Sequence, residues 1–166
     1  MRYEGGIGRI TTGINANMLV GKTVAFVRQQ LPEWRDDPNR VEEQAENRLN
    51  IQLCKFLEVR ARNEFPMACF HHEEYQTGQA RVDLSALPSR SVFIDARFHS
   101  IYDPFLVLEG KRLPAPSADR EKEYLIGNRR NGGMQRFKLG LHGADLSIAV
   151  MIGISRKNHH TTGMAS

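Results

Sequence analysis

Cysteine is scarce in this sequence, with only Cys54 and Cys69 among 166 residues. The two do not form a C-x-x-C motif and no further thiols accompany them, so neither a disulfide framework nor a cysteine zinc site is indicated. Long apolar runs are also missing: no stretch of about eighteen apolar residues occurs, and no charged segment followed by an apolar one opens the chain. We therefore expect neither membrane insertion nor export, and a reducing cytoplasm is the expected location.

Internal repeats and low-complexity tracts are absent as well, and the length suits one domain with one hydrophobic core. Hydrophobic residues make up 40% of the chain and charged residues 25%, a balance that excludes intrinsic disorder. The formal net charge is +4 and the pI is about 9.3. This mild excess suits an anionic partner such as nucleic acid but does not require one.

Apolar residues recur at three- and four-residue spacing over about residues 39–63, which predicts a long helix. They are Val41, Ala45, Leu49, Leu53, Phe56 and Leu57. Short stretches of β character follow at residues 67–70, 80–84 and 91–94. The unbroken apolar run at residues 105–108 predicts a central strand buried on both faces.

Residues 113–131 are polar and indicate a surface excursion or lid, after which residues 134–141 are a short helix candidate and residues 146–154 a second buried strand. This order predicts an α/β domain with a central mixed β-sheet flanked by helices. We expect an N-terminal arm or extension over residues 1–38, a core domain over residues 39–154 and a polar tail over residues 155–166.

Two acids and a lysine stand on predicted strands. Side chains alternate along a strand, so Glu109 and Lys111 project to the same face, and Asp83 joins them if the two strands pair. Two converging carboxylates repel each other unless a cation lies between them, and oxygen ligands select Mg²⁺ or Mn²⁺. A lysine beside such a site orients water or stabilises charge on a phosphate oxygen. These groups together indicate phosphodiester hydrolysis.

Asp83 and the run Glu109-Gly110-Lys111, with the apolar residues before them, resemble the D…E-x-K signature of the PD-(D/E)XK nucleases. This superfamily includes restriction enzymes, junction resolvases and bacterial defence effectors. The resemblance implies a restriction-endonuclease-like core over about residues 42–154. One departure is Val82, which stands where a proline often precedes the aspartate, and another is that the chain ends after one further strand.

The resemblance also implies roles for individual residues. Asp83, Glu109 and the carbonyl of Gly110 would bind the metal, and Lys111 would position the attacking water. Glu46, the acid expected on the first helix, would hold a second metal or a metal-bound water. If Glu46 is the wrong acid, Glu42, one turn earlier, takes its place.

Family members often carry a glutamine on the helix after the E-x-K strand, and Gln135 stands there in this chain. The same region is basic and suits a groove that follows phosphates, although a solvated surface is the ordinary alternative. The residues expected to contact nucleic acid are Arg112, Arg129, Arg130, Arg136 and Lys138.

The function expected from this resemblance is a Mg²⁺-dependent endonuclease that acts on DNA, with RNA as the alternative substrate, in bacterial or phage defence or in recombination. A homodimer or a larger defence complex is the expected assembly. The main alternative is a catalytically inactive nuclease-like module that binds nucleic acid or a protein partner. A third is a nucleotide-binding protein, because residues 16–23 fit a relaxed phosphate-loop pattern, although their spacer is apolar.

For four candidate residues the alternative is a purely structural role. Glu109 and Lys111 can form an exposed pair on an edge strand, and Asp83 can pair with Arg81 or cap a turn. Glu46 lies among other acids on its helix, most of which are expected to face water.

Overall fold

The computed structural model describes residues 19–75, 81–94, 96–125, 146 and 148–155. This part of the chain contains both helices and strands. In chain order they are α1 (Leu19–Asp36), α2 (Glu46–Glu64), β1 (Ala68–Tyr75), β2 (Arg81–Pro88), β3 (Val92–Ile94), β4 (Arg97–His99), β5 (Leu106–Leu113), α3 (Ala118–Leu125) and β6 (Ala149–Ser155).

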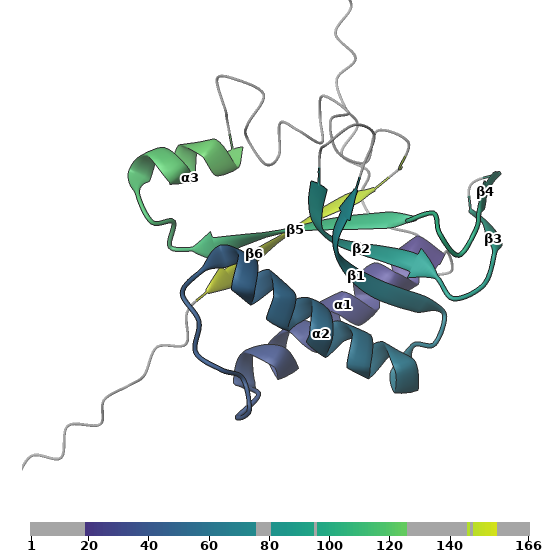
Figure 1. The fold of residues 1–166 in the computed structure, drawn as a ribbon, viewed down its shortest axis with the longest axis horizontal. Helices are drawn as coiled ribbons and strands as arrows, with labels where there is room; N and C mark the ends of the chain where they lie inside the picture. Colours follow the sequence, from purple (N-terminus) through teal and green to yellow (C-terminus); the bar gives the residue numbers. More distant parts are fainter. Residues whose placement is uncertain (1–18, 76–80, 95, 126–145, 147, 156–166) are drawn as a thin grey trace, which may run out of the picture.

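Four of the strands form a mixed sheet in the order β1-β2-β5-β6. The neighbours β1 and β2, and likewise β2 and β5, run antiparallel, whereas β5 and β6 run parallel. Strands β3 and β4 form a separate small hairpin. Helices α1 and α2 cover one face of the sheet (Figure 1). The predicted α/β class with a mixed sheet is therefore confirmed.

Strand β5 lies between β2 and β6, as its apolar sequence predicts. Leu106, Val107 and Leu108 are all 0% exposed, so both faces of the strand are covered. The even-numbered side chains belong to the core that the sheet shares with the helices. The odd-numbered ones project to the opposite face, because side chains alternate along a strand.

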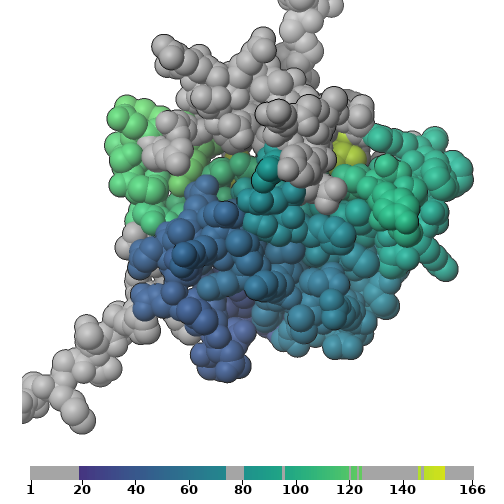
Figure 2. All heavy atoms as spheres, in the orientation of Figure 1, coloured from purple at the N-terminus to yellow at the C-terminus, as the bar shows by residue number. Residues whose placement is uncertain are grey.

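The core between helices and sheet contains an apolar stripe on α2, where Leu49, Leu53, Leu57 and Ala61 recur every four residues. These residues face the sheet, and α2 packs directly against β1 (Figure 2). None of the described helices is both long and apolar enough to cross a membrane.

The structure corrects the predicted start of the long helix. Helix α2 begins at Glu46 rather than near residue 39, and Val41 lies before it with 70% of its surface exposed. The carboxylate of Glu43 accepts hydrogen bonds from the backbone N–H groups of Gln44 and Ala45. Such local bonds offer the backbone an alternative to helix, which explains the later start.

Residues 19–36 also differ from the expected N-terminal arm, because they form helix α1. Val20, Phe26, Val27 and Trp34 of this helix are buried in the same core as α2 and the sheet. Val20, Val27 and Trp34 follow one another at seven-residue intervals, which are two helical turns each, and this spacing puts them on one face. Pro32 lies inside the helix and hides this pattern, since proline usually ends a helix.

The polar excursion predicted after residue 113 contains a short helix, α3. The helix expected at residues 134–141 lies outside the described residues, as does the tail from residue 156 onward. Strand β6 coincides with the second strand expected at residues 146–154, although it begins at Ala149. The expectation that this strand is buried is wrong, because β6 lies at the edge of the described sheet and only its Ile152 and Ile154 are buried.

Candidate active site

The pairing of β2 with β5 brings the two strand acids together. Leu84 lies opposite Leu108, and the same register continued by one residue sets Asp83 opposite Glu109. The backbone N–H of Gly110 donates a hydrogen bond of 3.0 Å to the Oδ2 of Asp83. The two strands therefore pair, as was required for Asp83 to join Glu109 and Lys111.

Lys111 lies among three carboxylates. Its Nζ is 2.8 Å from the Oε1 of Glu109, 3.2 Å from the Oε1 of Glu46 and 4.0 Å from the Oδ2 of Asp83. The lysine side chain is 14% exposed and the Glu109 side chain 5%. The structure thus gathers these four predicted residues from α2, β2 and β5, and the exposed edge-strand pair considered for Glu109 and Lys111 is wrong.

Glu46 reaches the site because it is the first residue of α2. Its Oε2 accepts hydrogen bonds of 3.1 Å from the backbone N–H of Arg112 and from the hydroxyl of Tyr124. A carboxylate in the first turn is also stabilised by the positive end of the helix. Glu42 lies before the helix and is exposed, so Glu46 is the acid that contacts Lys111.

The surroundings of Asp83 and Glu46 shift the pKa values of these two carboxyl groups in opposite directions. Burial and the negative charge of Glu109 raise the pKa of Asp83 to about 6, and Lys111 offsets this only in part. Burial would lower the pKa of Lys111, but Glu109, Asp83 and Glu46 outweigh it and the pKa is raised. Burial likewise raises the pKa of Glu46, yet the hydrogen bond from Arg112 and the charge of Lys111 leave it lowered. Asp83 is the carboxylate that an additional cation would stabilise most.

The donor set suits a small divalent ion. Mg²⁺ is usually held by one or two carboxylates, with water completing its shell, and here Asp83 and Glu109 both lie beside Lys111. The carbonyl of Gly110 accepts a hydrogen bond from Asn50, so its role as a metal ligand stays a prediction. Within the described ranges, no three histidine, cysteine, aspartate or glutamate side chains form a metal-ligating group. Glu46 already accepts bonds from Lys111, Arg112 and Tyr124, so its role as a metal ligand stays a prediction.

Asn50 is a site residue that the sequence analysis missed. It lies one turn after Glu46 on α2, is 1% exposed, and its Nδ2 donates to the carbonyl of Gly110 at 3.4 Å. A Cβ atom at position 110 would lie 1.9 Å from the Oδ1 of Asn50, so a larger residue fits at this position only if the Asn50 side chain moves. The four-residue spacing from Glu46 is the signal that could have revealed Asn50, because it places both on one helix face.

Tyr124 of α3 was missed as well. Its hydroxyl lies 3.1 Å from the Oε2 of Glu46 and 3.2 Å from the carbonyl oxygen of Arg112, and its ring centroid is 5.8 Å from the Nζ of Lys111. A single hydroxyl hydrogen serves one of these acceptors at a time. The polar sequence around Tyr124 carries no periodic signal that would have assigned it to the site.

The predicted nucleic-acid contacts are described only at Arg112. Its Nη1 donates to the carbonyl of Gln44 at 2.7 Å, which ties the segment before α2 to β5. Its contact with nucleic acid stays a prediction. The other four, Arg129, Arg130, Arg136 and Lys138, fall outside the described residues. So does Gln135, which was predicted as a residue of the catalytic site.

Two of the alternatives lose support. Arg81 forms an ion pair of 3.1 Å with Glu73, while Asp83 bonds to Gly110, so the expected pairing of Asp83 with Arg81 is not what forms. Thr23, the hydroxyl residue of the phosphate-loop pattern, is 0% exposed within α1 and donates to the carbonyl of Leu19 at 2.8 Å. That hydroxyl is not available to a nucleotide-bound metal ion.

No protein-family model, curated protein or solved structure matches this chain. The chemistry of the site itself is therefore what indicates a function.

Proposed function

We propose that this protein is a metal-dependent endonuclease with a restriction-endonuclease-like core, which hydrolyses phosphodiester bonds of DNA with Mg²⁺ or Mn²⁺. The observation that supports this most is the convergence of Glu109, Lys111, Asp83 and Glu46 from three separate elements. Burying a charged cluster of this kind is costly, and proteins retain perturbed groups of this sort mainly at functional sites.

In this proposal Asp83, Glu109 and the carbonyl of Gly110 hold the ion. The bound ion would polarise the phosphate and lower the pKa of an attacking water. Lys111 has a raised pKa and stays an ammonium at neutral pH, so it orients the water and stabilises charge on a phosphate oxygen rather than removing a proton. Glu46 holds that ammonium in place.

The second candidate function is a nuclease-like module that binds nucleic acid or a protein without cutting. It is favoured by the ion pairs of Lys111 with Glu109 and Glu46, which already compensate these charges. The two candidates differ in one property, since only the nuclease releases a cut product.

The test is cleavage of supercoiled plasmid DNA in Mg²⁺, in Mn²⁺ and in EDTA, with a labelled RNA as a parallel substrate. We expect metal-dependent nicking by the wild type and its loss in both Lys111→Ala and Glu109→Gln. The matched control is Lys55→Ala, which removes an exposed lysine from the middle of α2 and should cut like the wild type. If folded wild-type protein binds DNA but never cuts it, the binding module replaces the nuclease.

A place in defence or recombination, the cytoplasm as location and a dimer that cuts both strands belong to this proposal through the family resemblance alone.

A further inference from the structure

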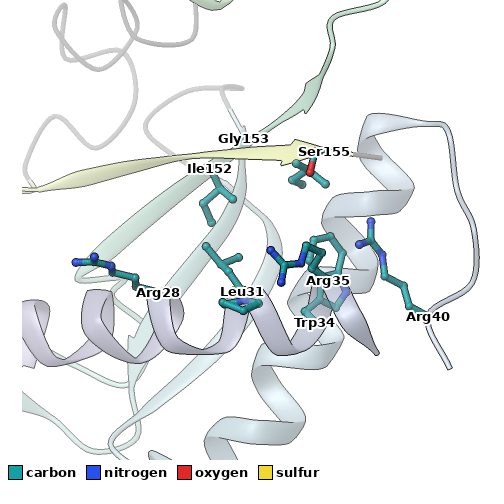
Figure 3. A pocket seen from close by; sticks show the side chains of 10 residues that line it. Arg28, Leu31, Trp34, Arg35, Arg40, Ile152, Gly153 and Ser155 are labelled. Atoms are coloured by element: carbon teal, nitrogen blue, oxygen red, sulfur yellow. The ribbon is translucent and has the colours of Figure 1, made fainter. Parts of the chain in front are cut away.

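A cavity of about 350 Å³ lies between the second half of α1 and the end of β6, and these two elements run side by side along it (Figure 3). A second cavity of about 190 Å³ adjoins it, because both are lined by Arg28, Leu31, Ile152 and Gly153. We call the two together the α1–β6 groove.

The groove reaches the outer edge of β6. Its lining includes every residue from 150 to 155. Side chains alternate between the two faces of a strand, so consecutive residues all line one groove only where that groove touches the backbone at the strand edge. β6 is the last strand of the described sheet and pairs there with β5 alone. Within that sheet, the N–H and C=O groups on the outer side of β6 have no strand to pair with.

This edge of β6 lacks the features that protect an edge strand. Natural edge strands discourage the addition of a further strand by charged side chains, especially lysine, or by proline. The sequence of β6 is Ala-Val-Met-Ile-Gly-Ile-Ser and contains neither. An edge of this composition is suited to pairing with another extended chain.

The charge of the groove restricts which chain fits it. Arg28 and Arg40 lie at opposite ends of the larger cavity (Figure 3), and none of the described lining residues of the groove is acidic. Arg35 forms two hydrogen bonds with the carboxylate of Asp36, so its charge is largely compensated. Among the described residues, no carboxylate pairs with the side chain of Arg28 or Arg40. A chain that fits the larger cavity therefore carries one acid toward each end.

Arg40 is fixed at its end of the cavity. Its guanidinium carbon lies 3.8 Å from the centroid of the Trp34 ring, which is only 5% exposed. Burial lowers the pKa of Arg40, so its surroundings disfavour the charge. Partly buried cations are normally paired, and a carboxylate from outside the chain would pair with this one.

We propose that the α1–β6 groove binds an extended acidic segment of a partner protein, which adds to the sheet as a strand beside β6. The backbone of the segment pairs with the outer edge of β6, its central apolar side chain packs on Leu31 and Ile152, and its two acids pair with Arg28 and Arg40. A peptide fits this edge better than a nucleic acid, because only a peptide offers alternating N–H and C=O groups to a strand. A second copy of β6 is disfavoured, since it would bring the same arginines to the same groove.

The geometry also sets the spacing of the two acids. Arg28 and Trp34, which holds Arg40, are separated by about 9 Å along the axis of α1. Two residues four apart on an extended chain are about 13 Å apart and lie on one face. Acids at this spacing therefore reach both arginines, whose long side chains cover the difference.

The test measures binding of a labelled peptide to the full chain in EDTA by fluorescence anisotropy. The peptide is Thr-Ser-Glu-Thr-Val-Thr-Glu-Ser-Thr, capped at both ends, and its control carries glutamine in place of both glutamates. We expect saturable binding of the acidic peptide and much weaker binding of the glutamine peptide. Arg40→Gln should weaken binding by about tenfold, the value of a charge-assisted hydrogen bond at a partly buried group. Arg28→Gln should weaken it by about two- to fivefold, because this pair is exposed.

The matched control is Arg90→Gln, which removes an exposed arginine from the loop after β2 and should bind like the wild type. Arg28→Gln changes only an exposed side chain, so it decides the outcome if Arg40→Gln disturbs Trp34. Hydrogen exchange then separates strand addition from attraction between charges alone. The bound peptide should slow exchange of the backbone amides of β6, while β1, the other edge of the described sheet, keeps its rate.

Four results would overturn the proposal. They are no binding of the acidic peptide, equal binding of the glutamine peptide, an equal loss of binding in Arg90→Gln, and no protection of β6 in the complex. A 5′-phosphorylated single-stranded oligonucleotide is titrated in parallel. If the oligonucleotide binds with the dependence on Arg28 and Arg40 expected for the peptide, and the peptide does not bind, the groove is a nucleic-acid site instead.

Discussion

The contact between Gly110 and Asn50 determines how closely the backbone of β5 packs against α2. The carbonyl of Gly110 faces the Nδ2 of Asn50, and the space that a Cβ would need at position 110 is filled by the Oδ1 of the same asparagine. That Oδ1 is buried and has no hydrogen-bond partner within the described residues. The proposed metal-binding carbonyl is therefore positioned by a residue from a different element.

Gly110→Ala should destabilise the protein. Its Cβ would overlap Asn50, and overpacking of this kind typically costs about 1 to 3 kcal/mol in the free energy of unfolding. Adding Asn50→Ala to the same chain should recover part of that loss, because the two side chains then no longer collide. Urea denaturation of the two single variants and the double variant measures the coupling. Strictly additive losses would show that the collision is not the cause.

Asp83→Asn should stabilise the metal-free protein at neutral pH. The folded-state pKa of Asp83 is about 6, above its ordinary value of 3.8, so the folded state binds this proton more tightly than the unfolded state does. The associated stability is complete below about pH 4 and is lost as the pH rises through 6. Asparagine avoids that loss and can still accept the hydrogen bond from Gly110 through its amide oxygen.

We therefore expect the variant to exceed the wild type by on the order of 1 to 2 kcal/mol above pH 6 and to match it near pH 4. Unfolding in EDTA at several pH values gives the comparison. A difference that does not change with pH would mean that the ionisation of Asp83 is not responsible.

Helix α1 is part of the core rather than an appendage. The ring of Phe26 stacks on Phe65 with centroids 5.1 Å apart and lies 6.1 Å from that of Phe70. These contacts connect α1 to the end of α2 and to β1. The cavity between α1 and β6 depends on this docking, since α1 forms one of its walls.

Phe26→Ala should lower the free energy of unfolding by about 3 to 5 kcal/mol, because it removes a buried ring from between two others. The control Gln29→Ala changes an exposed residue of the same helix and should stay within about 0.5 kcal/mol of the wild type. Thermal or urea unfolding separates the two. A neutral Phe26→Ala would restore the view of residues 19–36 as an arm.

At the level of the whole molecule, the candidate site joins four elements of the chain, which are α2, β2, β5 and α3. The hydrogen bond between Tyr124 and Glu46 spans 78 residues, and that between Lys111 and Glu46 spans 65. A ligand bound at this point contacts β2 and β5 together, so its binding energy should stabilise the whole fold.

Mg²⁺ or Mn²⁺ should therefore raise the melting temperature. At about one hundred times the dissociation constant, binding adds roughly 2.7 kcal/mol, and each kcal/mol corresponds to about 2 to 4 °C for a chain of this size. EDTA should reverse the shift, and Glu109→Gln should abolish it. Glu121→Gln, which changes an exposed acid on α3, is the matched control and should keep the shift. An equal shift in all three proteins would indicate metal binding elsewhere.

Periodicity within the sequence determined which side chains share a face of an element. The apolar run before Glu109 predicts a central strand, and alternation along it puts Glu109 and Lys111 together. These conclusions need only local geometry, which every strand repeats. That Asp83 joins them depended instead on the pairing of two strands, which the structure supplies.

Tertiary structure alone decided which distant groups complete the site. Choosing Glu46 over Glu42 depends on where α2 begins, and the local hydrogen bonds of Glu43 set that point. Asn50 and Tyr124 join the site because α2 and α3 dock beside β5. The cavity between α1 and β6 likewise exists only because these two elements lie side by side. Such approaches between distant segments follow from the packing of the whole core, which no local pattern in the sequence encodes.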